Sequence, residues 1–336
     1  MFLRSAVMLI LLTGLLSARS FTDASGKTIE AEFVSLSGET VTISRDGKPF
    51  TLPLARFSKA DQDFIKEQSN AKPVAPVATG KLMLAGKELR KGGELNVVEA
   101  PLTEETLKKT RKNKEVKTIK LGVVLPANFD PAAPQKVLWI SAAINSDAER
   151  TAGNISAING YSGTATANGW VVVAVDTNLG NPRQQDHLPA DFDMAVQQQG
   201  VAMLSAAWPG FAKSKFACAG FSGGSKSSFY RLGHLSTAGM DVVGLFLGGC
   251  NQNLTGGAKE ETKVRGGDLK KVKVFVSSGK TDDIATVQDC ESVAAGVEKD
   301  FGKVRLEVFE GGHSLSQEHL KAALGWFAEA GDTKGK

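Results

Sequence analysis

Histidine and cysteine are scarce in this chain, whose 336 residues include only 4 His and 3 Cys. No Cys-x-x-Cys or His-x-His spacing occurs, so the ligand patterns typical of zinc sites are missing. We therefore expect neither a bound metal nor a cofactor. Four histidines also leave a short list of candidates for a catalytic base.

An excess of one charge is also missing. Lys and Arg number 40 against 36 Asp and Glu, and the net charge of +4 is too small and too scattered to indicate nucleic acid as a partner. A local basic run from Lys108 to Lys120 is interpreted as a solvated connection. With 42% hydrophobic and 23% charged residues, the composition suits a globular protein with one large domain and a small one.

Long apolar runs are missing after the first twenty residues, so we expect no transmembrane span in the mature chain. The first twenty contain Arg4, an apolar run from Ala6 to Leu16 and small residues before Phe21, which is typical of a secretory signal peptide. We expect residues 1–20 to be a leader and the protein to be secreted or periplasmic. An uncleaved N-terminal anchor is the alternative.

In an oxidising compartment the three cysteines form at most one pair. Cys218 falls in a strand-like run and is interpreted as a small buried apolar residue. Cys250 and Cys290 follow two different strands, so either a disulfide joins them or both remain free.

Residues 21–69 predict a small β-rich domain, because apolar residues alternate at period two around Ala31, Val41 and Leu52. Ser58 is placed to cap a short helix, with Asp61 completing the reciprocal cap. Residues 70–80 contain Pro73 and Pro76 without an apolar period, so we expect a linker there.

This N-terminal segment resembles the Sla-type homology domain, an SH3-like barrel named from an endocytic adaptor. The resemblance is carried by Phe21-Thr22-Asp23, Gly26-Lys27, Ala31-Glu32-Phe33-Val34, Pro53-Leu54 and Ser58-Lys59-Ala60-Asp61-Gln62. It implies a binding or positioning module with a protein or cell-surface ligand. A stabilising appendage without a partner is the other interpretation.

From residue 81 to 331 strand-like and helical patterns alternate, which predicts an α/β domain with a mostly parallel sheet of eight strands and helices on both faces. The first strands lack an obvious helix between them and should pair antiparallel at one edge. The strand-like runs are Leu95 to Val98, Ile119 to Leu125, Val137 to Ile140, Trp170 to Val175, Phe216 to Ala219, Val243 to Leu247, Val272 to Val276 and Val304 to Phe309. The clearest helical patterns are Asp191 to Trp208, Ser222 to His234, Val287 to Phe301 and Ser316 to Ala330.

Gly220-Phe221-Ser222-Gly223-Gly224 matches the Gly-x-Ser-x-Gly nucleophile elbow between a strand and a helix. Small neighbours let strand and helix approach closely, and the helix N-terminus places positive potential where an oxyanion would develop. Ser222 is therefore the candidate nucleophile of a serine hydrolase.

A serine nucleophile needs a histidine base and an acid that orients it. His313 follows the last strand and is the candidate base; His234 and His319 lie on helices and are expected at the surface, while His187 is open to a pocket-wall role. Asp282 follows the seventh strand and is the candidate acid. Asp283 is the alternate, and Asp289 is expected on the following helix, facing water.

The order Ser222, Asp282, His313 resembles that of the α/β-hydrolase superfamily. Leu125-Pro126-Ala127-Asn128-Phe129-Asp130-Pro131, ahead of the third strand, resembles the secreted esterase and polyester-depolymerase group. The resemblance implies a Ser-Asp-His triad, with oxyanion donors from the amide of Gly223 and an amide after the third strand.

That third-strand loop departs from the family pattern, which often has His-Gly where this chain reads Trp139-Ile140-Ser141-Ala142-Ala143-Ile144-Asn145. A main-chain amide of Ala142 or Ala143 can serve as donor. The side chains of Ser141 and Asn145 are weaker options. Residues 251–270 are short and polar, so we expect no large lid and an open site suited to a polymer end, a surface-attached ester or a small acyl group.

Two classes of function follow. The first is an exported serine hydrolase that cleaves small-molecule or polymer esters through an acyl-enzyme; a serine peptidase of the same fold would share its residues. The second is a non-catalytic binding or adaptor protein, favoured by the unusual third-strand loop and the N-terminal module.

Overall fold

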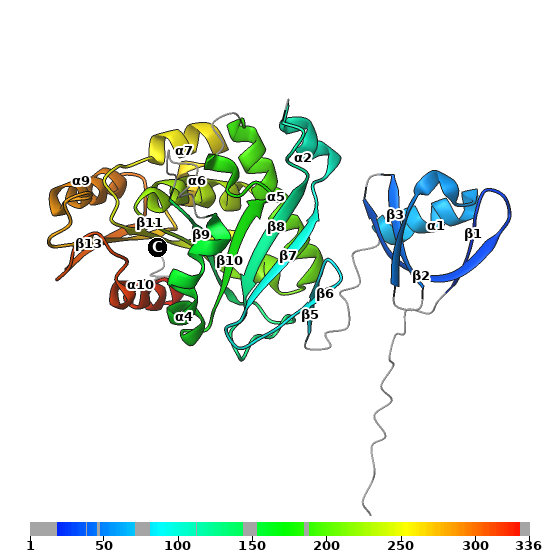
Figure 1. Ribbon diagram of the computed structural model, residues 1–336, viewed down its shortest axis with the longest axis horizontal. Coiled ribbons are helices and arrows are strands. Elements are labelled where there is room, and N and C mark those ends of the chain that lie inside the picture. Colours follow the sequence, from blue (N-terminus) through cyan, green and yellow to red (C-terminus); the bar gives the residue numbers. More distant parts are fainter. Residues whose placement is uncertain are drawn as a thin grey trace, which may run out of the picture. The chain divides into compact units, whose positions relative to one another are not determined.

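The computed structural model describes residues 19–37, 39–45, 48–70, 81–111, 113–143, 153–184 and 188–329. These residues fall into two compact units, one within Met1–Pro76 and one within Val77–Lys336 (Figure 1). Outside the described residues lie most of the expected leader and linker, together with Asn145 and His187. None of the described helices has the length and apolar character that a membrane crossing requires.

The N-terminal unit is a four-stranded antiparallel sheet followed by a helix. Its strands pair in chain order, β1 (Arg19–Thr22), β2 (Thr28–Ser37), β3 (Thr40–Arg45) and β4 (Lys48–Pro53), and the helical turn η1 (Leu54–Arg56) and helix α1 (Lys59–Asn70) follow. Alternate residues such as Val41 and Ile43 are buried with Phe21 and Ile65, as the period-two pattern predicts.

The first strand begins at Arg19, two residues before the expected start of the domain. Asp61 accepts hydrogen bonds from the Arg19 guanidinium at 2.6 Å and from the Thr22 amide at 2.8 Å. The Arg19 guanidinium also lies 3.7 Å from the centre of the Phe64 ring. Asp61 therefore joins α1 to β1. It also accepts a hydrogen bond from the Ser58 hydroxyl at 2.9 Å.

The second unit contains the expected eight-stranded, mostly parallel sheet. Its spatial order is β14-β13-β12-β11-β9-β10-β8-β7, and β8 pairs antiparallel with both β7 and β10. The third strand of this sheet, β9, therefore lies between β11 and β10, a crossover that strand patterns alone do not reveal. The strands are β7 (Leu95–Pro101), β8 (Thr118–Val124), β9 (Lys136–Ser141), β10 (Trp170–Thr177), β11 (Lys215–Phe221), β12 (Asp241–Gly248), β13 (Lys273–Gly279) and β14 (Lys303–Phe309); the hairpin β5 (Leu82–Leu84) and β6 (Lys87–Leu89) precedes them.

Helices cover both faces of this sheet (Figure 1). One buried cluster packs α5, α6 and α9 against the sheet, and a second packs α3, α4 and α10 against the opposite face. All eight residues of β10 are buried, which explains its continuous apolar run. The helices are α2 (Glu104–Lys109), α3 (Asn154–Ala157), α4 (Asn159–Ala167), α5 (Ala190–Ala207), α6 (Gly223–Thr237), α7 (Thr255–Thr262), α8 (Gly266–Leu269), α9 (Val287–Glu298) and α10 (Gln317–Ala328), with short turns η3 (Pro182–Gln184) and η4 (Phe211–Lys213).

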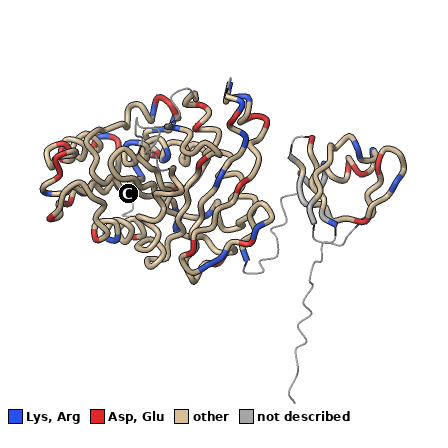
Figure 2. Tube along the Cα trace, in the orientation of Figure 1, with Lys and Arg blue, Asp and Glu red and all other residues tan. Residues whose placement is uncertain are grey.

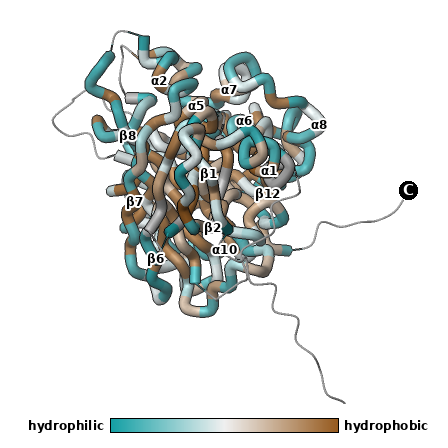
Figure 3. The backbone as a smooth tube through the Cα atoms, turned by 90° about the vertical axis from the view of Figure 1, so that its right-hand side faces the viewer, coloured by the Kyte–Doolittle hydropathy of each residue, from teal (hydrophilic) through white to brown (hydrophobic). Residues whose placement is uncertain are grey.

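Hydropathy and charge follow this layering. Hydrophobic positions gather along the strands, whereas α2 is largely hydrophilic (Figure 3). Lys and Arg are interspersed with Asp and Glu along the chain (Figure 2), and part of the basic run forms α2 and β8. The segment expected to be short and polar contains α7, whose Ala258 is buried.

All three cysteines are buried free thiols. The thiol of Cys290 donates a hydrogen bond to the carbonyl oxygen of Cys250 at 3.5 Å. Of the two alternatives for this pair, the structure therefore contains the free form.

The contact between α10 and the sheet gives a first prediction. A methyl group at Gly244 would lie 2.4 Å from the Phe327 ring, so we expect Gly244→Ala to lower the free energy of unfolding by about 1–3 kcal/mol. Gly325→Ala is the control, because no atom lies within 4 Å of the added methyl and alanine favours the helix. Urea denaturation compares the two, and equal stabilities would contradict the packing.

Candidate active site

Four neighbouring strands end together and bring the predicted catalytic residues to one edge of the sheet. Phe221 pairs with Gly248, Gly248 with Ser277, and Gly279 with Phe309. Parallel strands with aligned ends place the loops that follow them side by side. The residues after β11, β13 and β14 therefore share one edge.

Ser222 occupies a strained turn between β11 and α6. Its φ of +54° and ψ of −123° are rare for a residue with a side chain. Its amide donates to the Gly248 carbonyl at 2.8 Å, which holds the turn against the neighbouring strand. Although Ser222 is the N-cap residue of α6, its hydroxyl makes no capping hydrogen bond. The turn thus leaves the hydroxyl out of the helix cap.

Two glycines allow this turn to form. A Cβ atom at Gly220 would lie 2.0 Å from the Gly224 carbonyl oxygen, so strand and helix meet at backbone distance. A Cβ atom at Gly224 would lie 2.3 Å from the Ser141 carbonyl oxygen and 3.2 Å from the Ala143 nitrogen. The first turn of α6 therefore packs directly on the end of β9.

Asp282 and His313 form a hydrogen-bonded pair. The distance from His313 Nδ1 to Asp282 Oδ2 is 2.8 Å, and Asp282 Oδ1 accepts the amides of Ile284 and Ala285 at 2.9 and 2.8 Å. Burial opposes the charged carboxylate, but the hydrogen bonds from Ala285 and His313 outweigh it and hold the pKa of Asp282 below its usual value. Asp282 is thus an anchored carboxylate that accepts a hydrogen bond from the Nδ1–H group of His313, which leaves Nε2 as the reactive nitrogen.

The imidazole of His313 lies next to the elbow. Its ring centre is 4.6 Å from that of Phe221, the residue before Ser222. A Cβ atom at Gly249 would lie 3.2 Å from Cε1 of His313, so the ring packs closely against the backbone just after β12. The structure thus brings Asp282 and His313 into contact and places both beside the Ser222 turn.

The predicted oxyanion donors differ in their availability. Gly223 is the first residue of α6, so its amide has no acceptor within the helix. The amide of Ala142, by contrast, already donates to Asn154 Oδ1 at 2.9 Å, so Ala142 is not an available donor in this conformation. Ala143 lies against Gly224, and Ser141 is buried at the end of β9. The sequence did not single out Asn154, because its contacts depend on strands distant in the chain.

The remaining candidates lie elsewhere. His234 and His319 are buried rather than at the surface, with 1% and 7% of their surfaces exposed. Glu261 of α7 lies 3.9 Å from Nε2 of His234, and the Ser277 hydroxyl lies 2.9 Å from Nδ1 of His319. Asp289 is partly buried and caps α9 by accepting from Thr286, whereas Asp283 is exposed.

No family model matches the sequence, and no curated protein matches it. Among solved structures, an esterase with bound propionate from the planctomycete Thermogutta terrifontis is 15% identical with a TM-score of 0.47, covering 73% of this chain and 97% of its own. An α/β serine hydrolase without a lid from Xanthomonas campestris is 13% identical with a TM-score of 0.44, covering 70% and 93%. A putative dipeptidyl aminopeptidase IV from Bacteroides ovatus is 11% identical with a TM-score of 0.47, covering 92% and 43%.

Buried His234 gives a prediction for pH dependence. Burial lowers the pKa of His234 to about 3, whereas an unfolded histidine titrates near 6.5. Between these values the unfolded chain binds the proton and the folded chain does not, so stability falls as the pH falls. We expect His234 to contribute a loss of about 2 kcal/mol between pH 7 and pH 5.

Urea denaturation of wild type and His234→Gln at the two pH values measures this contribution. The variant should lose less free energy of unfolding than wild type on acidification. An equal loss in both proteins would show that His234 does not carry this pH dependence.

Proposed function

We propose that this chain is a serine hydrolase that cleaves carboxylic esters through an acyl-enzyme. The observation that carries the proposal is the Ser222 turn beside the hydrogen-bonded pair of Asp282 and His313. Ser222 has a rare backbone conformation, and its hydroxyl makes no capping hydrogen bond to the helix. A strained serine between strand and helix, with an imidazole and a carboxylate on nearby loops, suits nucleophilic catalysis. The edge of the sheet where they lie is the usual position of sites in α/β folds.

In this proposal the Ser222 oxygen attacks the ester carbonyl carbon while Nε2 of His313 accepts the hydroxyl proton. The amide of Gly223 and the N-terminus of α6 stabilise the negative charge that develops on the carbonyl oxygen. Collapse of the tetrahedral intermediate breaks the bond to the alcohol, which leaves with the proton from His313. Water then attacks the acyl-enzyme by the same steps and releases the acid. Asp282 keeps the Nδ1 proton in place and stabilises the charged imidazole.

The Ser222→Ala variant tests the proposal. Turnover of p-nitrophenyl acetate and labelling by a fluorophosphonate probe should both be lost, because the nucleophile is removed. Thermal unfolding should hardly change, since the hydroxyl caps no helix. The thermal unfolding measurement is the control, because a large drop in stability would show that the substitution damages the fold and not only the chemistry.

Absence of hydrolytic activity in the folded wild-type protein would favour the binding or adaptor function. The observation that supports this second candidate is the hydrogen bond from the Ala142 amide to Asn154, because it removes one expected oxyanion donor. A folded wild-type protein that the probe does not label at Ser222 would support it. Hydrolysis of peptide amides but not esters, in a panel with polyesters and acetylated sugars, would indicate the peptidase alternative.

Export belongs to the same proposal, with the N-terminal unit as an SH3-like module that positions the enzyme on a polymer or cell surface. Because Arg19 contacts Asp61 and Phe64 of the folded unit, the proposal places the end of the leader before Arg19 rather than after Ser20. N-terminal sequencing of the exported chain should therefore find Arg19 as its first residue. A chain that starts at Phe21 would contradict this boundary. A chain that is not exported would contradict the proposed export.

A further inference from the structure

Asn154 joins the carboxyl ends of two central strands. Its side chain is completely buried; Oδ1 accepts the Ala142 amide at 2.9 Å, and Nδ2 donates to the Val175 carbonyl at 2.7 Å. Its own amide donates to Asp176 at 2.9 Å, at the end of β10. One side chain therefore fixes the end of β9 relative to β10.

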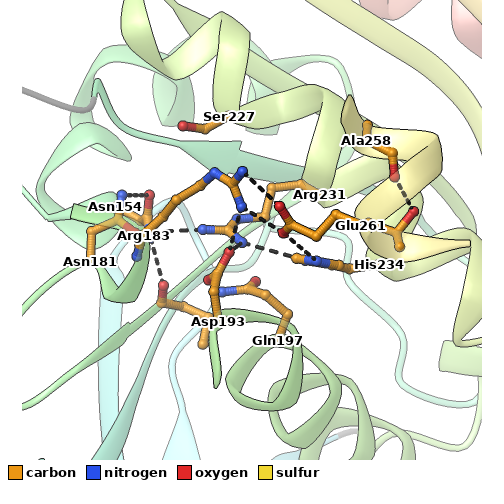
Figure 4. A network of polar contacts seen from close by, with 12 residues as sticks. Asn154, Asn181, Arg183, Asp193, Gln197, Ser227, Arg231, His234, Ala258 and Glu261 are labelled. Carbon is orange, nitrogen blue, oxygen red and sulfur yellow. Dashed lines mark hydrogen bonds and ion pairs between the residues drawn. The ribbon is translucent and has the colours of Figure 1, made fainter. Parts of the chain in front are cut away.

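A second buried asparagine extends this connection to the helix of the nucleophile. Nδ2 of Asn181 donates to Asn154 Oδ1 at 3.1 Å, and Nη2 of Arg231 lies 3.5 Å from Asn181 Oδ1. Arg231 belongs to α6, which begins directly after Ser222. The polar chain thus runs from the end of β9 through Asn154 and Asn181 to α6 (Figure 4).

Ion pairs hold the far end of this chain in place. Nη1 of Arg231 donates to Asp193 at 2.5 Å, with 1% and 2% of the two side chains exposed. Arg183 binds Glu261 through two hydrogen bonds of 2.8 and 3.2 Å, which joins η3 to α7 (Figure 4). Buried ion pairs often add little net stability compared with apolar residues, so a role in fixing geometry is the better account of Arg231 and Asp193.

This geometry matters because an oxyanion site needs its donors at fixed positions. Gly223 begins α6, Ser141 ends β9, and the two backbones meet at Gly224 without any side chain between them. Pairing of β9 with β11 up to Ser141 and Gly220 holds the strand ends together, but this pairing stops before Ala142. The chain through Asn154 and Asn181 adds a restraint on the backbone that follows Ser141.

We propose that Asn154 is a positioning residue of the acyl-transfer site. It binds the Ala142 amide, orients the backbone at the end of β9, and ties that backbone through Asn181 and Arg231 to the helix that carries Gly223. Asn154 touches neither substrate nor the reacting atoms, and it acts through the position of the β9 end. The inference rests on the proposed hydrolase function.

The test is Asn154→Ala, assayed with p-nitrophenyl acetate and with a phenyl trifluoromethyl ketone, whose adduct with serine mimics the oxyanion. We expect kcat to fall by about 10- to 100-fold while KM changes less than about twofold, because a displaced Gly223 amide stabilises the transition state less well. The inhibition constant of the ketone should rise by a similar factor. A rise in kcat, as expected if the freed Ala142 amide became an oxyanion donor, would overturn the proposal.

Asn96→Ala is the matched control. Asn96 is also a buried asparagine whose side chain binds backbone groups of Arg90 and Val123, but it lies on the edge strand β7. Its substitution should lower thermal stability to a similar extent without changing kcat or the inhibition constant. If Asn154→Ala behaves as Asn96→Ala does, the residue is merely structural and the proposal is overturned.

A second variant covers the case in which Asn154→Ala does not fold. Asn181→Ala leaves Asn154 in place but removes one bond to its Oδ1, and it should give the same split between kcat and KM with a smaller factor. An unchanged kcat and inhibition constant in a folded Asn181→Ala protein would overturn the proposal. Activity that survives in Ser222→Ala would instead overturn the proposed function, so the two failures are distinguishable.

Discussion

The close approach of the first turn of α6 to the ends of β9 and β11 is the contact on which the site depends. Gly220 and Gly224 permit it, and Ser222 pays for it with a backbone conformation that costs about 1–3 kcal/mol. The hydrogen bond from the Ser222 amide to Gly248 and the packing of α6 between sheet and helices hold the turn. The same turn places a serine hydroxyl and a helix N-terminus at the edge where Asp282 and His313 meet.

The sequence revealed much of this arrangement because its signals are local. Continuous apolar runs mark strands buried on both faces, and β10 is the clearest example. Polar residues that directly follow β11, β13 and β14 identify Ser222, Asp282 and His313 as neighbours, because the ends of parallel strands meet at one edge. The choice of Asp282 over Asp283 also agrees with the contact to His313.

Features that depend on distant contacts were not predictable. The position of β9 between β10 and β11 is a property of the whole sheet. His234 is buried beside Arg231 and Glu261, although its helical position alone suggested the surface. The hydrogen bond that occupies the Ala142 amide likewise depends on Asn154, twelve residues further along the chain, which also binds Asp176 of β10. Helix α7 was not predicted, because two glycines in its first turn disfavour a helix.

The central claim is that Ser222 forms a covalent acyl intermediate. Rapid quenching of wild-type protein with p-nitrophenyl acetate, followed by mass spectrometry of the intact chain and its peptides, tests this claim most directly. The account predicts the mass of one acetyl group per chain, located on the peptide that contains Ser222. An acetyl group on another residue, or turnover without any acetylated intermediate when deacylation is slowed at low pH, would contradict it.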